Sequence, residues 1–305
     1  MTEIRGARIL VSGTSGMIGS AIVAALKSDG AKIAKLTRPG ARPDLNNELI
    51  PWNPAQPIDA EAVSGFDAVI HLAGESVFGR WTAEKKARIR DSRIPATANL
   101  AQALAQGKVK PKVFVSASAI GYYGDRSDEL LNEESAPGTG FAADLARDWE
   151  QATKSAADAG IRTVRMRIGI VLARHAGALA QMLPPFRAGI GGRVGSGKQW
   201  MSWIDLADLI GAVQHILQTD ALSGPVNLVA PSPVTNVQFT KTLASVLHRP
   251  ALFPLPAFVM RLAFGEMADE LLLASDRVEP KRLLESGHTF QFTTLRSSLE
   301  HILKS

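Results

Sequence analysis

The sequence predicts an α/β protein in which a Rossmann-type doubly wound parallel sheet is joined to a smaller, mainly helical carboxyl-terminal lobe. In the first half of the 305-residue chain, short runs rich in Val and Ile alternate with longer segments of helical period, which is the pattern of βαβ units. After about residue 173 the chain changes to glycine- and proline-rich connections between helical segments. We therefore expect a Rossmann domain over residues 1–173, continued by a later strand near residues 226–229, and a second lobe over residues 174–305.

Seven segments have the length and the apolar content of buried strands. In chain order they are Arg8–Ser12, Lys32–Leu36, Leu49–Trp52, Ala68–Leu72, Lys112–Ser116, Thr163–Ile168 and Val226–Val229. Amphipathic periods predict helices in the first half at Met17–Ser28, Thr82–Gln106 and Ala142–Ala159, and in the lobe at Asp205–Gln218, Val237–Leu247, Ala257–Ala274 and Leu295–Lys304. Pro95 should kink or divide its helix, because proline lacks the N–H that a helix interior needs.

Composition argues against several classes of function. The 34 Lys and Arg residues outnumber the 29 Asp and Glu residues by only 34 − 29 = 5, and no basic run resembles a nucleic-acid-binding arm. The chain has no cysteine for disulfides or thiolate metal sites, and its six histidines lack metal-ligand spacing. The amino terminus lacks the apolar stretch of a signal peptide, and the longest uncharged run, residues 221–240, contains three prolines. We expect a cytoplasmic protein that binds no metal, nucleic acid or membrane.

A glycine-rich loop follows the first strand and opens the first helix. Its sequence, Gly13-Thr14-Ser15-Gly16-Met17-Ile18-Gly19, has the spacing GxxGxxG. Glycines at these positions permit a tight turn, a close approach of the backbone to a pyrophosphate and close packing of the helix on the strand, while the helix amino terminus favours an anion. We predict that this loop binds a dinucleotide; a structural glycine-rich turn is the alternative.

An arginine stands where the ribose of the cofactor would be recognised. The second strand ends at Thr37-Arg38, nineteen residues after Gly19, where an NAD-binding unit usually has an acid. A guanidinium pairs bidentately with a 2′-phosphate, so the sequence favours NADP over NAD, with Arg42 as an assisting cation. The alternative is that Arg38 is only a solvated loop cation.

Longer strings resemble a known family. The three glycines, together with His71-Leu72-Ala73-Gly74, resemble the extended short-chain dehydrogenase/reductase and nucleotide-sugar epimerase superfamily. More specific strings resemble its epimerase-like atypical subfamily, with the carboxyl-terminal domain of that subfamily: Leu72-Ala73-Gly74-Glu75, Arg80-Trp81-Thr82, Ser116-Ala117-Ser118-Ala119-Ile120-Gly121-Tyr122-Tyr123-Gly124, Gly195-Ser196-Gly197-Lys198-Gln199 and Gly265-Glu266-Met267-Ala268. The resemblance covers nearly the whole chain.

The resemblance implies that NADP(H) lies in an open crevice at the carboxyl ends of the strands. The adenine end would lie near Gly13–Gly19 and Thr37–Arg38, and the nicotinamide end near Ser116–Ser118 and Arg167–Ile170. The cofactor-binding residues implied are Gly13, Thr14, Gly16, Met17, Ile18, Gly19, Thr37, Arg38, Leu72, Ala73, Gly74, Glu75, Arg80, Ser116, Arg167 and Gly169. Glu75 has helix or loop capping as its alternative role, and Arg80 has that of an exposed cation.

The proton relay of the superfamily is missing. Its members normally use a Tyr hydroxyl as acid/base, with a Lys four residues on that lowers the Tyr pKa. No YxxxK occurs here, and the helix after the fifth strand has Phe141 and Leu145 in those places. Ser118 and Tyr123 are therefore our candidate catalytic hydroxyls, with structural packing of the tyrosine as the alternative.

Four side chains are candidates for binding a substrate. Tyr122 stands beside Tyr123, while Lys198, Gln199 and Trp200 follow a glycine-rich string that should face the nicotinamide. The alternative for Trp200 is a structural bridge between the two lobes. His71, on an apolar strand, is interpreted as a core histidine rather than a base.

Two functions remain open on the sequence. The first is an NADP(H)-binding, epimerase-like oxidoreductase that transfers a hydride reversibly to or from a small polyhydroxylated or nucleotide-linked substrate. The second is a non-catalytic NADP(H)-binding sensor or regulatory protein, which the missing Tyr/Lys relay motivates. Neither function fixes an oligomeric state.

Overall fold

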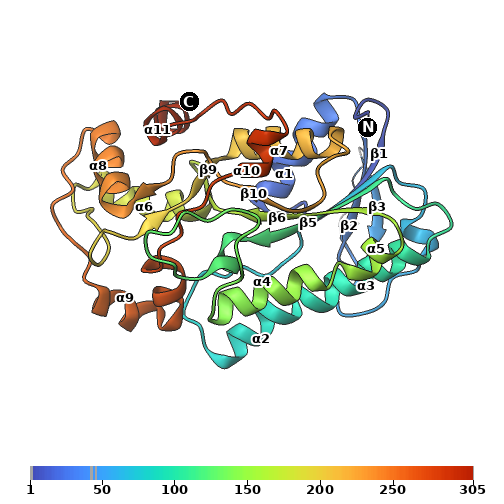
Figure 1. The fold of residues 1–305 in the computed structure, drawn as a ribbon, viewed down its shortest axis with the longest axis horizontal. Coiled ribbons are helices and arrows are strands. Elements are labelled where there is room, and N and C mark those ends of the chain that lie inside the picture. Colours follow the sequence, from blue (N-terminus) through green and yellow to red (C-terminus); the bar gives the residue numbers. More distant parts are fainter. Residues whose placement is uncertain (1–2, 42–43, 45–46, 305) are drawn as a thin grey trace.

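The structure, a computed structural model, describes residues 3–41, 44 and 47–304. Arg42, the predicted assisting cation, lies outside the described residues. A central sheet is covered by helices on both faces, and further helices lie beyond the carboxyl edge of the sheet (Figure 1). The predicted fold class, a Rossmann-type sheet with a mainly helical carboxyl-terminal lobe, is confirmed.

Seven parallel strands form the central sheet in the order β10-β6-β5-β4-β1-β2-β3. Their bounds are β1 (Arg8–Ser12), β2 (Lys32–Thr37), β3 (Glu48–Pro51), β4 (Ala68–His71), β5 (Val113–Ala119), β6 (Arg162–Ile168) and β10 (Gly224–Leu228). Every expected strand is present, with ends within two residues of the prediction except at β5, which continues three residues further. The strand order reverses between β1 and β4, and ligands of such sheets bind outside the carboxyl ends of the strands at that point.

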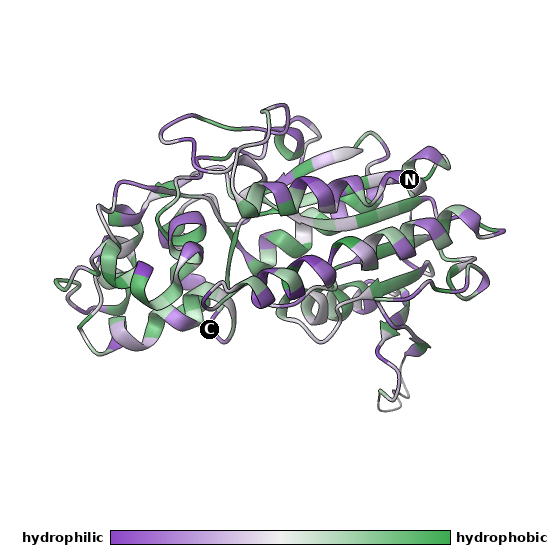
Figure 2. Cartoon of the chain, turned by 90° about the horizontal axis from the view of Figure 1, so that it is seen from below, coloured by the Kyte–Doolittle hydropathy of each residue, from purple (hydrophilic) through white to green (hydrophobic). Residues whose placement is uncertain are grey.

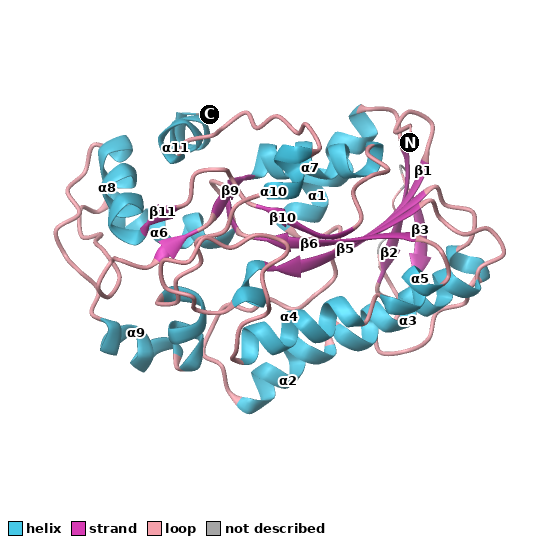
Figure 3. Cartoon of the chain, viewed as in Figure 1, coloured by secondary structure: helices cyan, strands magenta, loops and turns pink. Residues whose placement is uncertain are grey.

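Helices cover both faces of the sheet because successive strand residues point to opposite sides. Ile9 and Val11 pack in a cluster with α1 (Met17–Ser28) and α7 (Leu206–Gln218). Leu10 packs in a second cluster with α3 (Ile94–Gln106) and α5 (Lys154–Asp158), and α4 (Phe141–Gln151) and α2 (Ala83–Asp91) lie on the same side (Figures 1 and 3). The strands are mostly hydrophobic, while the flanking helices carry hydrophilic residues outward (Figure 2).

Helix boundaries follow local signals only in part. The division at Pro95 is confirmed: α2 ends at Asp91, and α3 begins at Ile94 with the proline in its first turn. The expected single helices over residues 142–159 and 257–274 are wrong. The first is divided into α4 and α5, and the second ends at Gly265, whose φ is +61°, leaving α9 (Ala257–Phe264) and a π-helical turn (Ala268–Leu272).

The carboxyl-terminal lobe is built on three helices that share an apolar cluster: α6 (Gly177–Arg187), α8 (Asn236–Leu247) and α11 (Leu295–Lys304). Two small sheets involve the lobe, and only the first of them joins it to the Rossmann domain. In one, β7 (Ile170–Leu172) pairs with β9 (Trp203–Asp205); in the other, β8 (Trp200–Met201) pairs with β11 (Val234–Thr235). The sequence analysis missed α6, because two prolines lie inside it, and the short α10 (Lys281–Glu285).

Candidate functional site

The predicted cofactor-binding segments gather at one edge of the sheet. The glycine-rich loop follows the carboxyl end of β1, Thr37–Arg38 that of β2, Leu72–Glu75 that of β4, and Gly169 that of β6. Since β1 and β4 flank the reversal of strand order, the glycine-rich loop and Leu72–Glu75 lie side by side. These four segments therefore lie together at the carboxyl edge of the sheet, whereas Ser116 and Arg167, which were predicted with them, are buried.

The glycine-rich loop is shaped for an anion. Gly13 has a φ of +72°, and a Cβ there would lie 2.7 Å from the carbonyl carbon of Leu72. A Cβ on Gly19 would collide with the carbonyl oxygen of Gly13. Gly16 is the N-cap of α1, so no side chain caps the first turn, and no acid lies in it. The backbone N–H groups and the positive end of the helix dipole are thus available to a phosphate, and these residues fit a dinucleotide.

Arg38 lies at the same edge of the sheet as the glycine-rich loop, since β2 pairs in parallel with β1. It is exposed directly after the carboxyl end of β2, and Thr37 before it is half-buried. Within the described ranges, no acid or carbonyl group is paired with the Arg38 guanidinium. The charge is therefore not neutralised by a described neighbour.

A buried hydrogen-bonded chain supports the turn after β4. Ser12 Oγ accepts the backbone N–H groups of Leu72 and Ala73, at 3.1 and 3.3 Å, and lies 2.7 Å from His71 Nδ1. Because two donors occupy the Ser12 oxygen, its own hydrogen donates to Nδ1, and His71 Nε2–H then donates to Thr97 Oγ1 at 3.1 Å. Burial lowers the pKa of His71 to about 4, so the ring is neutral at pH 7. This arrangement agrees with the interpretation of His71 as a core histidine.

The turn itself is fixed by cations of α2 and by Arg93, which directly precedes α3. The Glu75 carboxylate accepts Lys85 Nζ at 2.7 Å and Arg88 Nε at 3.2 Å, and these hydrogen bonds lower the pKa of Glu75. Arg93, which is buried, donates to the Glu75 carbonyl oxygen at 2.9 Å, and its guanidinium would lie 3.0 Å from a Cβ on Gly74. The sequence analysis gave Arg93 no role, because it bonds the backbone carbonyl oxygens of Ile89 and Glu75, and such bonds leave no signal in residue type.

A second buried network lies behind the carboxyl ends of β5 and β6. Arg167 is bidentate to Glu150, with Nε–Oε1 at 2.8 Å and Nη2–Oε2 at 3.0 Å. Ser118 Oγ donates to the same Glu150 Oε1 at 2.8 Å. Burial lowers the pKa of Arg167, but the hydrogen bonds and the charge of Glu150 outweigh burial, and its pKa is raised. Arg167 therefore remains charged although it is only 3% exposed.

The two adjacent tyrosines contact this arginine differently. Tyr123 accepts a hydrogen bond from Arg167 Nη1 at 2.9 Å and donates one to Asn227 Oδ1 at 2.8 Å. Burial raises the pKa of Tyr123 to about 12, despite the neighbouring guanidinium. The Arg167 guanidinium instead lies over the face of the Tyr122 ring, with 3.5 Å from Arg167 Cζ to the ring centroid. Tyr122 is only half-buried, and its hydroxyl has no partner among the described residues.

These contacts weigh against the two hydroxyls that we predicted as catalytic. Tyr123 is 0% exposed and Ser118 is 3% exposed, so neither reaches a substrate in this conformation. Each hydroxyl is already hydrogen-bonded inside the network. The geometry gives both a positioning role, and Tyr122 is the tyrosine of the pair that is only half-buried.

The places of the superfamily relay are filled by apolar packing. Phe141 and Leu145 belong to a cluster with Trp81 and Met267, and the Phe141 and Trp81 rings are 5.0 Å apart, edge to face. The carboxylate of Glu270 accepts the backbone N–H groups of Phe141, at 2.8 Å, and of the next residue, so the first turn of α4 is closed by the lobe. No proton donor stands at these places.

The predicted substrate-binding residues of the lobe separate into two kinds. Gln199 is buried, and its amide donates to the carbonyl oxygens of Val194 and Leu272, so it holds two segments of the lobe together. Trp200 donates a hydrogen bond to Asp128, and the Arg277 guanidinium lies over its ring. These contacts agree with the alternative role given above for Trp200, a structural bridge between the two lobes. Lys198 is exposed, and its side chain has no partner among the described residues, so it remains a candidate for ligand contact.

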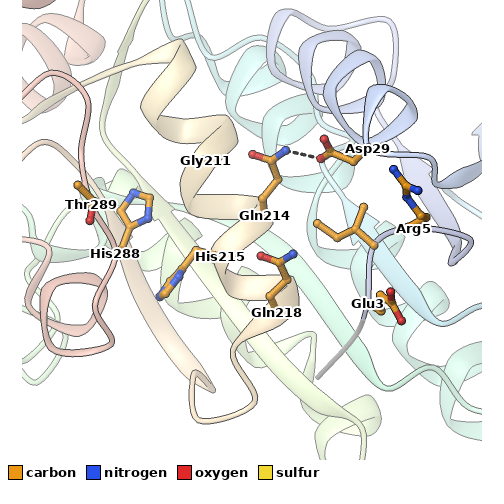
Figure 4. Close-up of a pocket in the computed structure, with 10 residues that line it drawn as sticks. Glu3, Arg5, Asp29, Gly211, Gln214, His215, Gln218, His288 and Thr289 are labelled. Atoms are coloured by element: carbon orange, nitrogen blue, oxygen red, sulfur yellow. Dashed lines mark hydrogen bonds between the residues drawn. The ribbon is translucent and has the colours of Figure 1, made fainter.

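A cavity of about 550 Å³ lies away from this crevice, at the amino edge of the sheet (Figure 4). It is lined by residues preceding β1, by Asp29 at the end of α1, and by His215 of α7 and His288 (Figure 4). The described residues contain no group of three potential metal-ligating side chains. Among the residues that the structure describes, no helix has the length and apolar character needed to cross a membrane.

Comparison with known protein families agrees with this architecture. Residues 9–229 match the family described as NAD dependent epimerase/dehydratase, and residues 255–302 match a domain of unknown function, DUF1731. The fold and the glycine-rich crevice define a Rossmann-type nucleotide-binding protein. The chain belongs to the NAD-dependent epimerase/dehydratase family, which confirms the resemblance noted above.

Individual relatives match over nearly the full chain. An epimerase family protein of Mycobacterium leprae is 41% identical over 299 residues, 97% of this chain and 96% of the relative. The crystal structure of human epimerase family protein SDR39U1 with NADPH has a TM-score of 0.89 at 33% identity and covers 98% of this chain and 99% of that one. A nucleoside-diphosphate sugar epimerase from Corynebacterium glutamicum has a TM-score of 0.80 at 34% identity, covering 98% of this chain and 59% of that one. UDP-glucose 4-epimerase from Thermotoga maritima, at 17% identity, shares the fold.

Proposed function

We propose that this protein binds NADP(H) and transfers a hydride reversibly between the nicotinamide and a small polyhydroxylated or nucleotide-linked substrate. The observation that carries the proposal is that two features lie at the same edge of the sheet. One is the uncapped amino terminus of α1, and the other is Arg38, an exposed cation whose charge no described neighbour neutralises. The human relative, 33% identical, crystallised with NADPH, which supports the same choice of cofactor. The cytoplasmic location and the small-molecule partner belong to the proposal.

The residues of the crevice would have different roles in binding the cofactor and in positioning Tyr122. The glycine-rich loop would hold the pyrophosphate and Arg38 the 2′-phosphate, while Leu72–Glu75 would line the cofactor beside the loop. The bound cofactor would supply or accept the hydride. Glu150 and Arg167 fix the plane against which Tyr122 lies.

Tyr122 is our candidate for the group that exchanges a proton with the substrate oxygen. A hydride transfer at a carbinol carbon needs such a partner, and general acid/base groups contribute typically ~10²–10⁴-fold. Tyr123 and Ser118 are buried in hydrogen bonds, and Phe141 has no proton to give. The half-buried Tyr122, whose ring lies against Arg167 and whose hydroxyl has no partner among the described residues, is therefore the hydroxyl left for this role.

Isotope transfer tests the proposal. The pure protein would be incubated with stereospecifically deuterated NADPH and a pool of small metabolites, and label in the products would be followed by mass spectrometry. We expect transfer in the wild type and in Tyr123→Phe at a reduced rate, and a loss of about 100-fold or more in Tyr122→Phe with unchanged NADPH affinity. Absence of transfer to any metabolite, with NADPH bound, would reject hydride transfer.

A second function is favoured by one observation. The places of the superfamily relay lie inside an apolar cluster closed by Glu270, so the chain is built there for packing. An NADP(H)-binding sensor or regulatory protein would need only the cofactor half of the crevice. It would show NADPH affinity and a cofactor-dependent change in the hydrogen exchange of the lobe, without label transfer.

A further inference from the structure

The carboxyl-terminal lobe presents an apolar surface around α9, which we call the α9 surface. It consists of Leu252, Phe253, Leu255, Phe258, Val259 and Leu262. Leu252 and Leu262 are 77% and 75% exposed, and no residue of α9 is buried. With roughly 200 Å² for a phenylalanine, Phe253 and Phe258 alone expose about 250 Å². The four aliphatic side chains add to this area, and a contiguous apolar patch of more than a few hundred Å² marks an interaction site.

Backbone contacts hold the segment before α9 in place. The N–H groups of Phe253 and Leu255 donate to the carbonyl oxygens of Gly191 and Arg193, at 3.3 and 2.8 Å. This pairing fixes the apolar residues that precede α9 against the glycine-rich segment of the lobe. Within α9, Phe258 lies one turn before Leu262, so the two side chains share a helix face. Figure 1 shows α9 at the periphery of the molecule, at the end away from the amino terminus.

Three exposed arginines border the α9 surface. Arg193 lies in the glycine-rich segment that pairs with the chain before α9, and Arg249 precedes the surface by three residues. At the other end of α9, Arg80 Nη1 donates to the carbonyl oxygen of Leu262 at 2.5 Å. Among the residues that the structure describes, none of the three guanidinium groups is paired with an acid. The apolar side chains therefore lie beside cations whose charge is not neutralised.

The chain segments that contain the α9 surface and the neighbouring loop have no acidic residue. Residues 159–204 and 221–265 contain ten Lys and Arg residues but no Asp or Glu. The acids that follow α9 are already engaged, since Glu266 and Asp269 are each paired with a cation at 2.8 Å, and Glu270 accepts N–H groups of α4. The unneutralised charge beside the α9 surface is therefore positive.

We propose that the α9 surface binds peripherally to a membrane that contains anionic lipids. Side chains such as Phe258 and Leu262 would enter the boundary between headgroups and acyl chains, about 5–10 Å deep, while the arginines attract the anionic headgroups. A second copy of the chain would bring like charges together, and a nucleic acid would leave the aliphatic side chains exposed to water. The expectation that the protein binds no membrane was based on the lack of a spanning or signal segment, and a peripheral surface needs neither.

Vesicle flotation of the full chain tests the role of the charges. Vesicles of phosphatidylcholine alone are compared with vesicles that also contain phosphatidylglycerol. We expect the wild type to float with the anionic vesicles and to be released by high salt, which screens the attraction. Arg249→Glu should weaken this binding by about 10-fold or more, because it replaces an attraction by a repulsion. Arg5→Glu is the matched control, since Arg5 is an exposed cation at the amino edge of the sheet, and it should bind like the wild type.

A single fluorescent label tests the insertion of the apolar side chains. The chain has no cysteine, so Leu262→Cys provides one site for an environment-sensitive dye. Its emission should shift to the blue when anionic vesicles are added. Leu284→Cys is the control, because Leu284 is 47% exposed on α10, at a distance from α9 (Figure 1), and its label should not respond. Without any label, Phe258→Ser should weaken flotation by about 10-fold or more.

The outcomes separate the possible occupants of the surface. Circular dichroism and thermal melting would show that the variants remain folded, as the exposure of the substituted side chains predicts. A wild type that does not float with anionic vesicles at low salt would overturn the proposal, as would flotation that both Phe258→Ser and Arg249→Glu leave unchanged. Equal binding to phosphatidylcholine alone would contradict the role of the arginines. A chain that associates with itself in sedimentation velocity, loses this association in Phe258→Ser and ignores vesicles would assign the surface to a second copy instead.

Discussion

At the scale of single residues, we propose that Arg38 determines which cofactor the crevice accepts. Its guanidinium follows β2 at the carboxyl edge, and no described acid neutralises it. Hydrogen bonds to charged groups contribute about 1.5–3 kcal/mol, so Arg38→Asp should weaken NADPH binding by roughly 10–100-fold or more through lost pairing and added repulsion. NADH binding should change by less than about threefold, because NADH lacks the 2′-phosphate.

Isothermal titration calorimetry with both cofactors measures the difference. Lys32→Asp is the matched control, because Lys32 is an exposed cation on the same strand at its opposite end. Equal dissociation constants for NADPH and NADH in the wild type would contradict the assignment of the 2′-phosphate to Arg38.

His71 makes the stability of the fold depend on pH in the acid range. Its pKa is lowered from 6.5 to about 4 by burial, so below pH 6.5 the unfolded chain takes up a proton that the folded chain refuses. The corresponding stability is present above the unfolded pKa and is lost as the pH falls from about 6.5 to about 4, in total about 3 kcal/mol. Urea unfolding of the wild type and of His71→Gln should be measured at pH 7 and at about pH 4. The variant should be less stable than the wild type at pH 7, but its stability should fall less on going to acid.

His175→Asn provides the comparison for that experiment, since His175 is exposed. Its acid sensitivity should equal that of the wild type. If His71→Gln kept the full acid sensitivity, the loss would have to come from other groups, such as His288, whose pKa burial also lowers to about 4.

At the scale of elements, local patterns predicted what local interactions determine. The unit from β1 to α1 was predicted to the residue, because its glycines, apolar period and strand are contiguous. The division between α4 and α5 has no glycine or proline signal. There the Thr153 hydroxyl donates to the Glu150 carbonyl oxygen at 2.7 Å, a side-chain bond that competes with the helix.

In the candidate site, too, the part formed by neighbouring residues could be predicted and the part formed by distant residues could not. The glycine-rich loop could be predicted from the sequence because one contiguous string contains it. The buried network could not, since Tyr123 meets Asn227 across 104 positions and Ser118 meets Glu150 across 32. Periodicity and spacing contain no signal for such pairs, and for that reason the hydroxyls predicted as catalytic are buried instead.

At the scale of the whole molecule, the two predicted segments share one core. Residues of α7 and β10, which follow residue 173, lie in the same apolar cluster as Ile9 and Val11 of β1. The lobe also reaches back through Glu270, which closes the first turn of α4. Without the second segment, the Rossmann sheet would therefore lack its edge strand β10, and the helical layer that contains α1 would lack α7.

This sharing predicts that the chain unfolds in a single cooperative transition. Far-UV circular dichroism follows all helices, while tryptophan fluorescence reports both on Trp52 and Trp149, in the first segment, and on Trp203, in the second. We expect the urea midpoints of the two probes to coincide, because loss of α7 would expose the β1 face of the core. A fragment of residues 1–173 should not fold alone, as judged by dispersed amide resonances. Two separated transitions, or a folded fragment, would show instead that the Rossmann segment is stable without the lobe.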